Sequence, residues 1–494
     1  MSPIVIVFWI MAAGTLFLPE VVALYFFICM TPFGALNTMP EAFSSVNLLP
    51  QTVAALILAA RAMMNKDMRT AQLTALVKWR GFAFLALFVV YGVFSAFVFP
   101  RIFEGRVEVF ALQGVAGRTK LEPTMANINQ SAYLISDLLS VTALFAYLKC
   151  DRTGEVREHL MKASMICGLL LLGTGLLEYS DVAPELVAMF RTASYDNFVT
   201  GEVVTLHRIA GFFPEASAYG PKCVVFGGLL FFGRAACRSN LWRKVWCPLV
   251  AMILIGVGAL STSSTAFCCI FLFLGLLCAR IGYLIFRRRR FAEYSLDVSL
   301  LVFGALVLGL AWMAAPELLN GPINLLDSAV FKKGESSSYI ERSGWNSLGK
   351  LAFWGTDGVG VGVGGARVSN WAIAVVSNTG VVGTALMGAY LYFLFYQKPT
   401  KTNPRWATLA HAGKYSMAIF MAGEVVSGTT IDPGQIFSIL AATIAAGSAW
   451  SDQIGQPAAR KKRPASAPGL RRRKPGEAAP QPEEPQTAFA SPQA

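Results

Sequence analysis

The sequence predicts an all-α polytopic membrane protein, and three observations carry that prediction. Of its 494 residues, 55% are hydrophobic and only 14% are charged, whereas a soluble domain averages about 25% charged residues. The apolar runs are long and unbroken, as in Leu301–Ala315, while the strands of a membrane barrel alternate and are about 10 residues long. The third observation is that Lys and Arg residues gather in alternate loops between these runs. Because backbone groups inside lipid must be satisfied within the chain, we expect spanning helices.

About 20 apolar residues are needed for each spanning helix, and the apolar runs predict twelve or thirteen of them. The first two runs are short, and they are either two helices or one long, tilted segment broken near Glu20. The predicted spans lie near 4–17, 19–34, 46–64, 81–99, 131–148, 160–177, 216–233, 246–260, 265–286, 298–314, 370–396, 411–428 and 433–450.

The Lys and Arg residues orient this helical map. The net charge is +13, and most of the 42 Lys and Arg residues fall in one alternating set of loops. Because cytoplasmic loops carry an excess of Lys and Arg, we expect this set and the C-terminus in the cytoplasm. The charge then reflects topology, and no soluble basic domain is present to bind nucleic acid. The basic set comprises 61–80, 149–162, 234–244, 280–290, 398–414 and the tail after 455.

Three long segments fall on the opposite, external side, near 100–130, 178–215 and 315–369. Loops longer than about 15 residues are usually functional or disordered, and these contain Trp, Phe, Tyr and Gly. We expect them to be partly helical and to pack over the mouth of a bundle formed by residues 1–455. Residues 456–494 are rich in Pro, Ala, Arg and Lys and lack an apolar period, so they predict a disordered cytoplasmic tail.

Cysteine and histidine usage argues against a metal centre. The nine Cys residues lie in or beside apolar runs, and the chain has only three His residues. We therefore expect no disulfide framework, no metal site and no cofactor.

Two arginines on the predicted outer side are candidates for binding an anion. Arg208 and Arg342 stand where the positive-inside rule disfavours them. The planar guanidinium group suits phosphate and pyrophosphate, so converging arginines at a membrane mouth would fit an anionic lipid headgroup. The alternative is that each pairs with a local acid, such as Glu341 or Glu202.

Three further titratable residues are candidates for a functional role. Glu215 follows Pro214 where a loop becomes a helix, and it is either stabilised by that helix terminus or acts as a base or sugar-hydroxyl ligand. His207 is the only external histidine and titrates near neutral pH, although an ordinary loop histidine is the simpler interpretation. Glu424 stands in an otherwise apolar helix, which makes it a functional candidate by default or an internal hydrogen-bonding group.

Glycine alternates with valine between Gly358 and Gly364. Such a backbone can approach a ligand closely, or it forms a plain turn or re-entrant segment. It is not a dinucleotide fingerprint, because no strand precedes it and the spacing differs from GxGxxG.

Two of these stretches carry a resemblance to a known family. The stretch Gly211-Phe-Phe-Pro-Glu-Ala-Ser-Ala-Tyr-Gly220 resembles the G-x-F-x-E-P-S stretch of bacterial polysaccharide polymerases. Arg342-x-x-Trp345, the glycine alternation, Ser369-Asn370 and Asn378-Thr-Gly-Val-Val-Gly383 are similar to the long-loop pattern of the Wzy polymerase and O-antigen ligase superfamily. The resemblance spans roughly residues 200–395 by motif and the whole chain by layout.

The resemblance implies metal-independent glycosyl transfer from an undecaprenyl-pyrophosphate-linked oligosaccharide, at the periplasmic face of a GT-C-like helical bundle. By position, Arg208 and Arg342 would hold the leaving pyrophosphate, where developing negative charge needs cations, and Glu215 would orient or deprotonate the acceptor hydroxyl. A chain-length regulator and a flippase are the protein partners it suggests. The predicted substrate-binding residues are Arg191, His207, Trp345, Gly360, Gly362, Arg367 and Asn370.

Two departures from the family pattern bear on the reaction. O-antigen ligases typically show a His-Asn pair where this chain has Ser369-Asn370, which favours a polymerase. Ala216 replaces the usual Pro of the E-P-S stretch. The alternatives are a ligase that passes glycan to a lipid A core or a protein, a transporter or flippase, and a membrane scaffold without catalysis. Transporters usually place polar groups at mid-membrane in both halves, whereas the polar motifs here lie in outer loops.

Overall fold

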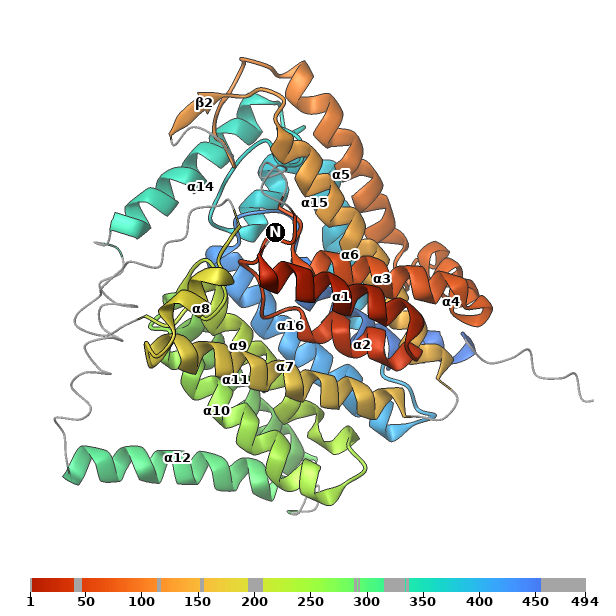
Figure 1. Ribbon diagram of the computed structural model, residues 1–494, viewed down its shortest axis with the longest axis vertical. Coiled ribbons are helices and arrows are strands. Elements are labelled where there is room, and N and C mark those ends of the chain that lie inside the picture. The colour runs from red at the N-terminus through yellow and green to blue at the C-terminus, as the bar shows by residue number, and fades with distance from the viewer. Residues whose placement is uncertain are drawn as a thin grey trace, which may run out of the picture. The chain divides into compact units, whose positions relative to one another are not determined.

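The computed structural model describes residues 2–39, 47–112, 117–151, 155–193, 208–287, 291, 294–314, 334 and 337–454 (Figure 1). The chain divides into a compact unit, Met1–Gly455, and a second unit, Gln456–Ala494. The predicted disordered tail lies outside the described residues.

Nearly all regular structure in the first unit is helical. The helices are α1 (Pro3–Phe17), α2 (Glu20–Cys29), α3 (Pro50–Met64), α4 (Lys66–Val77), α5 (Ala83–Ile102), α6 (Met125–Cys150), α7 (Val156–Tyr179), α8 (Pro184–Met189), α9 (Ala216–Gly233), α10 (Cys247–Leu260), α11 (Ser264–Phe286), α12 (Ser295–Ala314), α14 (Ser337–Gly355), α15 (Trp371–Tyr396), α16 (Pro404–Ser427) and α17 (Gly434–Ala446), with short turns η2 (Arg234–Ala236), η3 (Trp242–Trp246) and η7 (Ala449–Gln453). The strands are β1 (Glu108–Phe110) and β2 (Arg118–Lys120).

The predicted fold class is confirmed: the chain is an all-α polytopic membrane protein. Each predicted span coincides with a described helix. Among the described residues, six helices are long and apolar enough to cross a membrane by themselves, namely α5, α6, α7, α11, α15 and the helix Trp242–Leu260. The elements that the apolar runs did not predict are α4, α8, α14 and the β1–β2 hairpin.

The first two helices form a hairpin, and not one broken segment. Phe8 of α1 stacks on Phe26 of α2 with ring centroids 5.8 Å apart. Between them Pro19 precedes α2, and proline cannot continue a helix. The carbonyl of Thr15, near the end of α1, accepts a hydrogen bond from Arg61 of α3 at 2.7 Å. This contact satisfies a backbone group that the helix end leaves free.

Helices α9 and α6 each organise one half of the bundle. α9 packs on α7, α10, α11 and α16, which lie side by side in Figure 1. The buried Tyr219 of α9 donates a hydrogen bond to the Leu171 carbonyl of α7 at 2.7 Å. α6 packs on α3, α4, α5 and α17. Because α16 contacts both α9 and α17, it joins the two halves.

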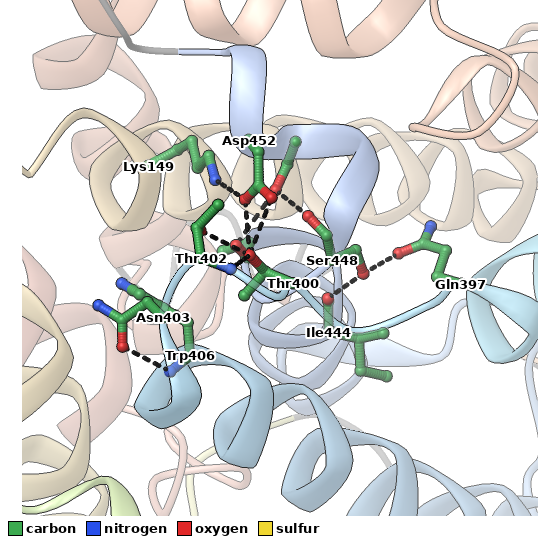
Figure 2. Close-up of polar contacts among 11 residues, drawn as sticks. Lys149, Gln397, Thr400, Thr402, Asn403, Trp406, Ile444, Ser448 and Asp452 are labelled. Carbon is green, nitrogen blue, oxygen red and sulfur yellow. Dashed lines mark hydrogen bonds and ion pairs between the residues drawn. The ribbon is translucent and has the colours of Figure 1, made fainter.

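Polar contacts close the end of the bundle that we predict to face the cytoplasm (Figure 2). Asp452 forms an ion pair with Lys149 at 3.5 Å and accepts hydrogen bonds from Thr400 at 2.8 and 2.9 Å. Ser448 donates to the Gln397 side chain at 2.6 Å. These contacts tie the ends of α6, α15 and α17 to the segment before α16.

At the same end, Asp297 anchors the start of α12. Its carboxylate is fully buried and pairs with Arg234 after α9 and with Arg280 of α11. A buried carboxylate needs such partners, because an unpaired charge inside a protein is strongly destabilising.

The predicted periplasmic segments differ from expectation in their detail. The segment near 100–130 was expected to be partly helical, but it contains the antiparallel β1–β2 hairpin, in which Val109 lies opposite Thr119. Val109 packs with Phe103 and Leu121 in a small apolar cluster. In the other two segments α8 and α14 are helical, as expected. Most of the stretch between α12 and α14 lies outside the described residues.

The glycine-rich stretch, residues 358–364, lies beside a break in α15. Gly380 has φ +61° and ψ −160°, which interrupts the helix. The carbonyls of Ser377 and Asn378 then accept hydrogen bonds from the amides of Val361 (2.9 Å) and Gly362 (2.8 Å), and the Val381 amide donates to the Gly358 carbonyl at 3.0 Å. The stretch therefore binds the backbone groups that the break releases, as burial requires.

Glycine is needed in this stretch for two reasons. Gly358, Gly360, Gly362 and Gly364 all have positive φ, a conformation that costs other L-residues about 1–2 kcal/mol. A Cβ on Gly360 would also lie 2.7 Å from the Gly380 amide nitrogen. Neighbouring backbone therefore occupies the space that a side chain would need.

We predict that Gly360→Ala lowers the stability of the folded bundle by more than about 2 kcal/mol, through backbone strain and the contact with α15. The measurement is thermal unfolding in detergent. Gly388→Ala is the matched control, because Gly388 is a helical glycine of α15 with nothing within 4 Å of its Cβ position. Equal unfolding temperatures for the two variants would contradict this account.

Candidate functional site

An ion pair joins the two outer stretches that the sequence singled out. Arg342 of α14 donates to the Glu215 carboxylate at 2.9 Å. Each side chain is about a quarter exposed (25% and 24%), so solvent reaches the pair. Glu215 is the residue immediately before α9. Arg342 thus pairs with a distant acid, and not with the neighbouring Glu341.

Arg208 interacts electrostatically with both members of this pair, and it has no direct ion-pair partner among the described residues. Its side chain is half-buried, and its Nε atom is buried with no hydrogen-bond partner among the described residues. Burial lowers the pKa of Arg208, while the Glu215 carboxylate raises it and Arg342 lowers it. Arginine nevertheless stays charged at physiological pH. The result is a partly desolvated cation whose nearest charges are Glu215 and Arg342.

A second ion pair holds the loop that carries Arg208. Glu178, at the end of α7, accepts hydrogen bonds from the amides of Ala210 (2.7 Å) and Gly211 (2.6 Å). Arg191 donates both to Glu178 and to the Gly211 carbonyl. Arg191, predicted to bind substrate, is therefore engaged in positioning the loop.

Two charged residues are missing from the predicted set of site residues: Lys222, which interacts electrostatically with Glu215, and Glu424, which interacts with Lys222. Lys222 is two turns into α9, and its ammonium lies 4.5 Å from the centre of the Phe213 ring. The carboxylates of Glu424 and Glu215 are the acidic groups that act on it electrostatically. A charged residue in an apolar helix is a functional candidate. We applied this rule to Glu424 alone, and it could also have placed Lys222 in the predicted set of site residues.

Close helix packing brings Lys222 and Glu424 together. A Cβ on Gly423 of α16 would lie 3.4 Å from the Cβ of Pro221 in α9. The next residues in the chain are Glu424 and Lys222, so both lie at the same level of the α9–α16 contact. We call Arg208, Glu215, Lys222, Arg342 and Glu424 the mouth cluster.

The side chains of Trp345 and Arg367 contact each other one helical turn beyond Arg342. The Arg367 guanidinium lies 4.2 Å from the centre of the Trp345 ring, a cation–π contact. The Arg367 amide donates to the Phe110 carbonyl of β1 at 2.7 Å. Trp345 is one turn beyond Arg342 on α14, so the hairpin and the glycine-rich stretch both support the helix that carries Arg342.

The remaining predicted residues have structural roles or are not described. Asn370 caps α15 by accepting a hydrogen bond from the Ile373 amide at 3.1 Å. Gly360 and Gly362 are buried against backbone of other segments, so packing, and not ligand contact, accounts for these glycines. His207 lies outside the described residues.

Comparison with known families gives no independent identification. No protein-family model matches the chain, and no curated protein matches it either. The chemistry of the site must be argued from its own residues.

The mouth cluster can bind an anion next to a carboxylate. It combines three cations with two carboxylates, and among the described residues only one direct ion pair, Arg342 with Glu215, joins them. Cations with unused hydrogen-bond donors suit phosphate or pyrophosphate oxygens. No group of three or more His, Cys, Asp or Glu residues placed to hold a metal ion occurs in the part of the chain that the structure describes.

We predict that the mouth cluster faces the periplasm, because the basic loops lie at the opposite helix ends. Lys350 of α14 and Lys401 before α16 are both exposed. In a protein whose exposed Cys278 is replaced by Ser, a membrane-impermeant maleimide should label Lys350→Cys in intact cells. Lys401→Cys should react only after lysis. The reverse pattern would contradict the predicted orientation.

Proposed function

We propose that this protein is a metal-independent membrane glycosyltransferase. It would polymerise undecaprenyl-pyrophosphate-linked oligosaccharide repeat units into exopolysaccharide, capsule or O-antigen at the periplasmic face of the bacterial inner membrane. The observation that carries the proposal is the convergence of Arg208 and Arg342 on Glu215, from segments far apart in the sequence. The resemblance of these same stretches to polysaccharide polymerases supports it.

The two arginines are arranged to act on the leaving group. During glycosyl transfer, negative charge grows on the pyrophosphate as the bond from its oxygen to the sugar breaks. Cations fixed in place before the reaction stabilise such charge without reorganising. Arg342 is fixed by Glu215 at 2.9 Å, and the loop of Arg208 is fixed by Glu178. Among the described residues, no carboxylate forms a direct ion pair with Arg208, so its charge is available to the pyrophosphate.

The surrounding bundle suits a lipid-linked donor. α14 carries Arg342 and Trp345 and also exposes apolar side chains, including Ile340 (64%), Leu351 (65%) and Trp354 (72%). Exposed apolar groups beside a polar site are expected where a lipid tail or the bilayer covers them. The polyprenyl chain would lie along these helices while its pyrophosphate enters the mouth cluster.

The choice between polymerase and ligase turns on Ser369, which stands where ligases typically have His. Ser369 is almost fully buried (2% exposed), and its amide donates to the Asn346 side chain at 2.8 Å. A buried hydroxyl cannot replace the acid–base chemistry of an imidazole. This observation favours the polymerase over the ligase.

We predict that cells lacking this protein accumulate single repeat units on the lipid carrier. The reason is that a polymerase acts on the carrier-linked unit before any other consumer of it. The measurement is a glycan profile of the lipid-linked fraction by mass spectrometry. Long polymer still attached to the carrier would instead indicate a ligase, and a normal profile would contradict the proposal.

Arg208→Lys and Arg342→Lys should each reduce polymer growth by about 100-fold or more, because a point charge replaces the planar donor pair. Polymer length is measured by gel electrophoresis at matched protein levels. Arg118→Lys is the control, since Arg118 is exposed on β2. Normal polymer length in both variants would show that the two arginines are not part of the site.

A further inference from the structure

The mouth cluster contains two carboxylates, and they differ in how their oxygens are used. Glu215 accepts a direct hydrogen bond from Arg342 at 2.9 Å. The oxygen that accepts this bond is engaged with the guanidinium, which leaves less of the carboxylate open to a sugar hydroxyl. Glu215 is therefore better suited to fixing Arg342 than to accepting a proton.

Glu424 is the carboxylate that is free to react. No hydrogen bond or ion pair joins its side chain to another group among the described residues. Among the charged groups, Lys222 has the largest electrostatic effect on Glu424, followed by Asp432. Lys222 in turn has no direct acceptor in the described structure, and its ammonium rests on the Phe213 ring.

The Glu424 side chain is half-buried near the end of α16. The helix ends at Ser427, and the Gly428 amide donates to the Glu424 main-chain carbonyl at 2.7 Å. A Cβ on Gly428 would lie 2.7 Å from the carboxylate oxygen Oε2 and 2.9 Å from the Cβ of Trp371. The missing side chain at Gly428 thus leaves the space that this carboxylate occupies.

We propose that Glu424 is the catalytic base, and that Glu215 is a positioning residue for Arg342. The proposal rests on the proposed function. In the transfer step, the acceptor hydroxyl oxygen attacks the anomeric carbon of the donor sugar and forms the new glycosidic bond. Its proton passes to the Glu424 carboxylate. The bond between the anomeric carbon and the pyrophosphate oxygen breaks, and the electron pair leaves with the lipid pyrophosphate, held by Arg208 and Arg342.

Lys222 connects the two carboxylates of the mouth cluster electrostatically. Its electrostatic neighbours are Glu424 and Glu215, one carboxylate for each role. In this scheme Lys222 adds a third positive charge facing the pyrophosphate. Lys222 is a positioning residue in this scheme, and the acceptor hydroxyl would bind between it and Glu424.

The test compares Glu424→Gln with Glu215→Gln in purified full-length protein in lipid nanodiscs. The substrate is lipid-linked oligosaccharide extracted from cells that lack the protein. Glu424→Gln should reduce kcat by about 10²–10⁴-fold, the usual contribution of a general base, with little change in KM for the donor. Glu215→Gln should act mainly on KM, because Arg342 loses its fixed orientation. Glu185→Gln is the control, since Glu185 is an exposed carboxylate on α8.

The pH profile separates a base from a structural residue. In the wild-type protein, kcat should fall at acidic pH as the base is protonated, and Glu424→Gln should lose that dependence. Glu424→Asp should restore part of the rate together with the acid limb. The titratable groups that face Glu424 are Lys222 of α9, Cys269 of α11 and Asp432 after α16, and Asp432→Asn and Cys269→Ser should keep the acid limb.

The outcomes of this assay bear on different claims. Normal kcat in Glu424→Gln with transfer by the wild-type protein would overturn the assignment of the base and leave the proposed function intact. Loss of kcat in Glu215→Gln, with Glu424→Gln unaffected, would return the role of base to Glu215. No transfer by folded wild-type protein would overturn both the inference and the proposed function.

Discussion

The break in α15 at Gly380 is the constraint on which the candidate site depends. A helix interrupted inside a bundle releases carbonyls and amides that lipid cannot satisfy. The glycine-rich stretch binds them, and it can do so because the residues at positive φ are glycines that let two backbones meet. α14 leads directly into this stretch, so the position of the helix that carries Arg342 is fixed by those backbone hydrogen bonds. The Arg342–Glu215 pair then links α14 to α9.

The cations at the two ends of the bundle differ in whether acidic side chains pair with them. At the end predicted to be cytoplasmic, Arg234 and Arg280 share the buried Asp297, and Lys149 pairs with Asp452. In the mouth cluster, Arg208 and Lys222 have no direct acceptor among the described residues. Because desolvating a charge without a partner is unfavourable, this difference suggests that the mouth cluster is organised for a ligand that is itself an anion.

Much of the helical layout could be predicted because a long apolar run in lipid is stable only as a helix. The limits of that reasoning are visible in particular residues. The stretch 337–355 is amphipathic and not continuously apolar, so hydropathy did not reveal α14. The glycine alternation predicted close approach but not its target, which is the α15 backbone. Arg208, Glu215 and Arg342 were predicted as a set from their types and their placement, whereas Lys222 was overlooked because it stands inside a helix whose neighbours are apolar.

The distribution of direct bonds in the mouth cluster argues for a division of labour between its carboxylates. If both Glu215 and Glu424 paired with guanidinium groups, the cluster would be electrostatically satisfied and neither carboxylate would be basic enough to accept a proton. If neither did, Arg342 would lack a fixed orientation at the end of an exposed helix. The observed arrangement satisfies one carboxylate and leaves the other without a direct partner among the described residues. An enzyme of the proposed kind, which must hold a leaving anion and also remove a proton, needs both conditions at once, and the α9–α16 contact brings Lys222 and Glu424 to the same level.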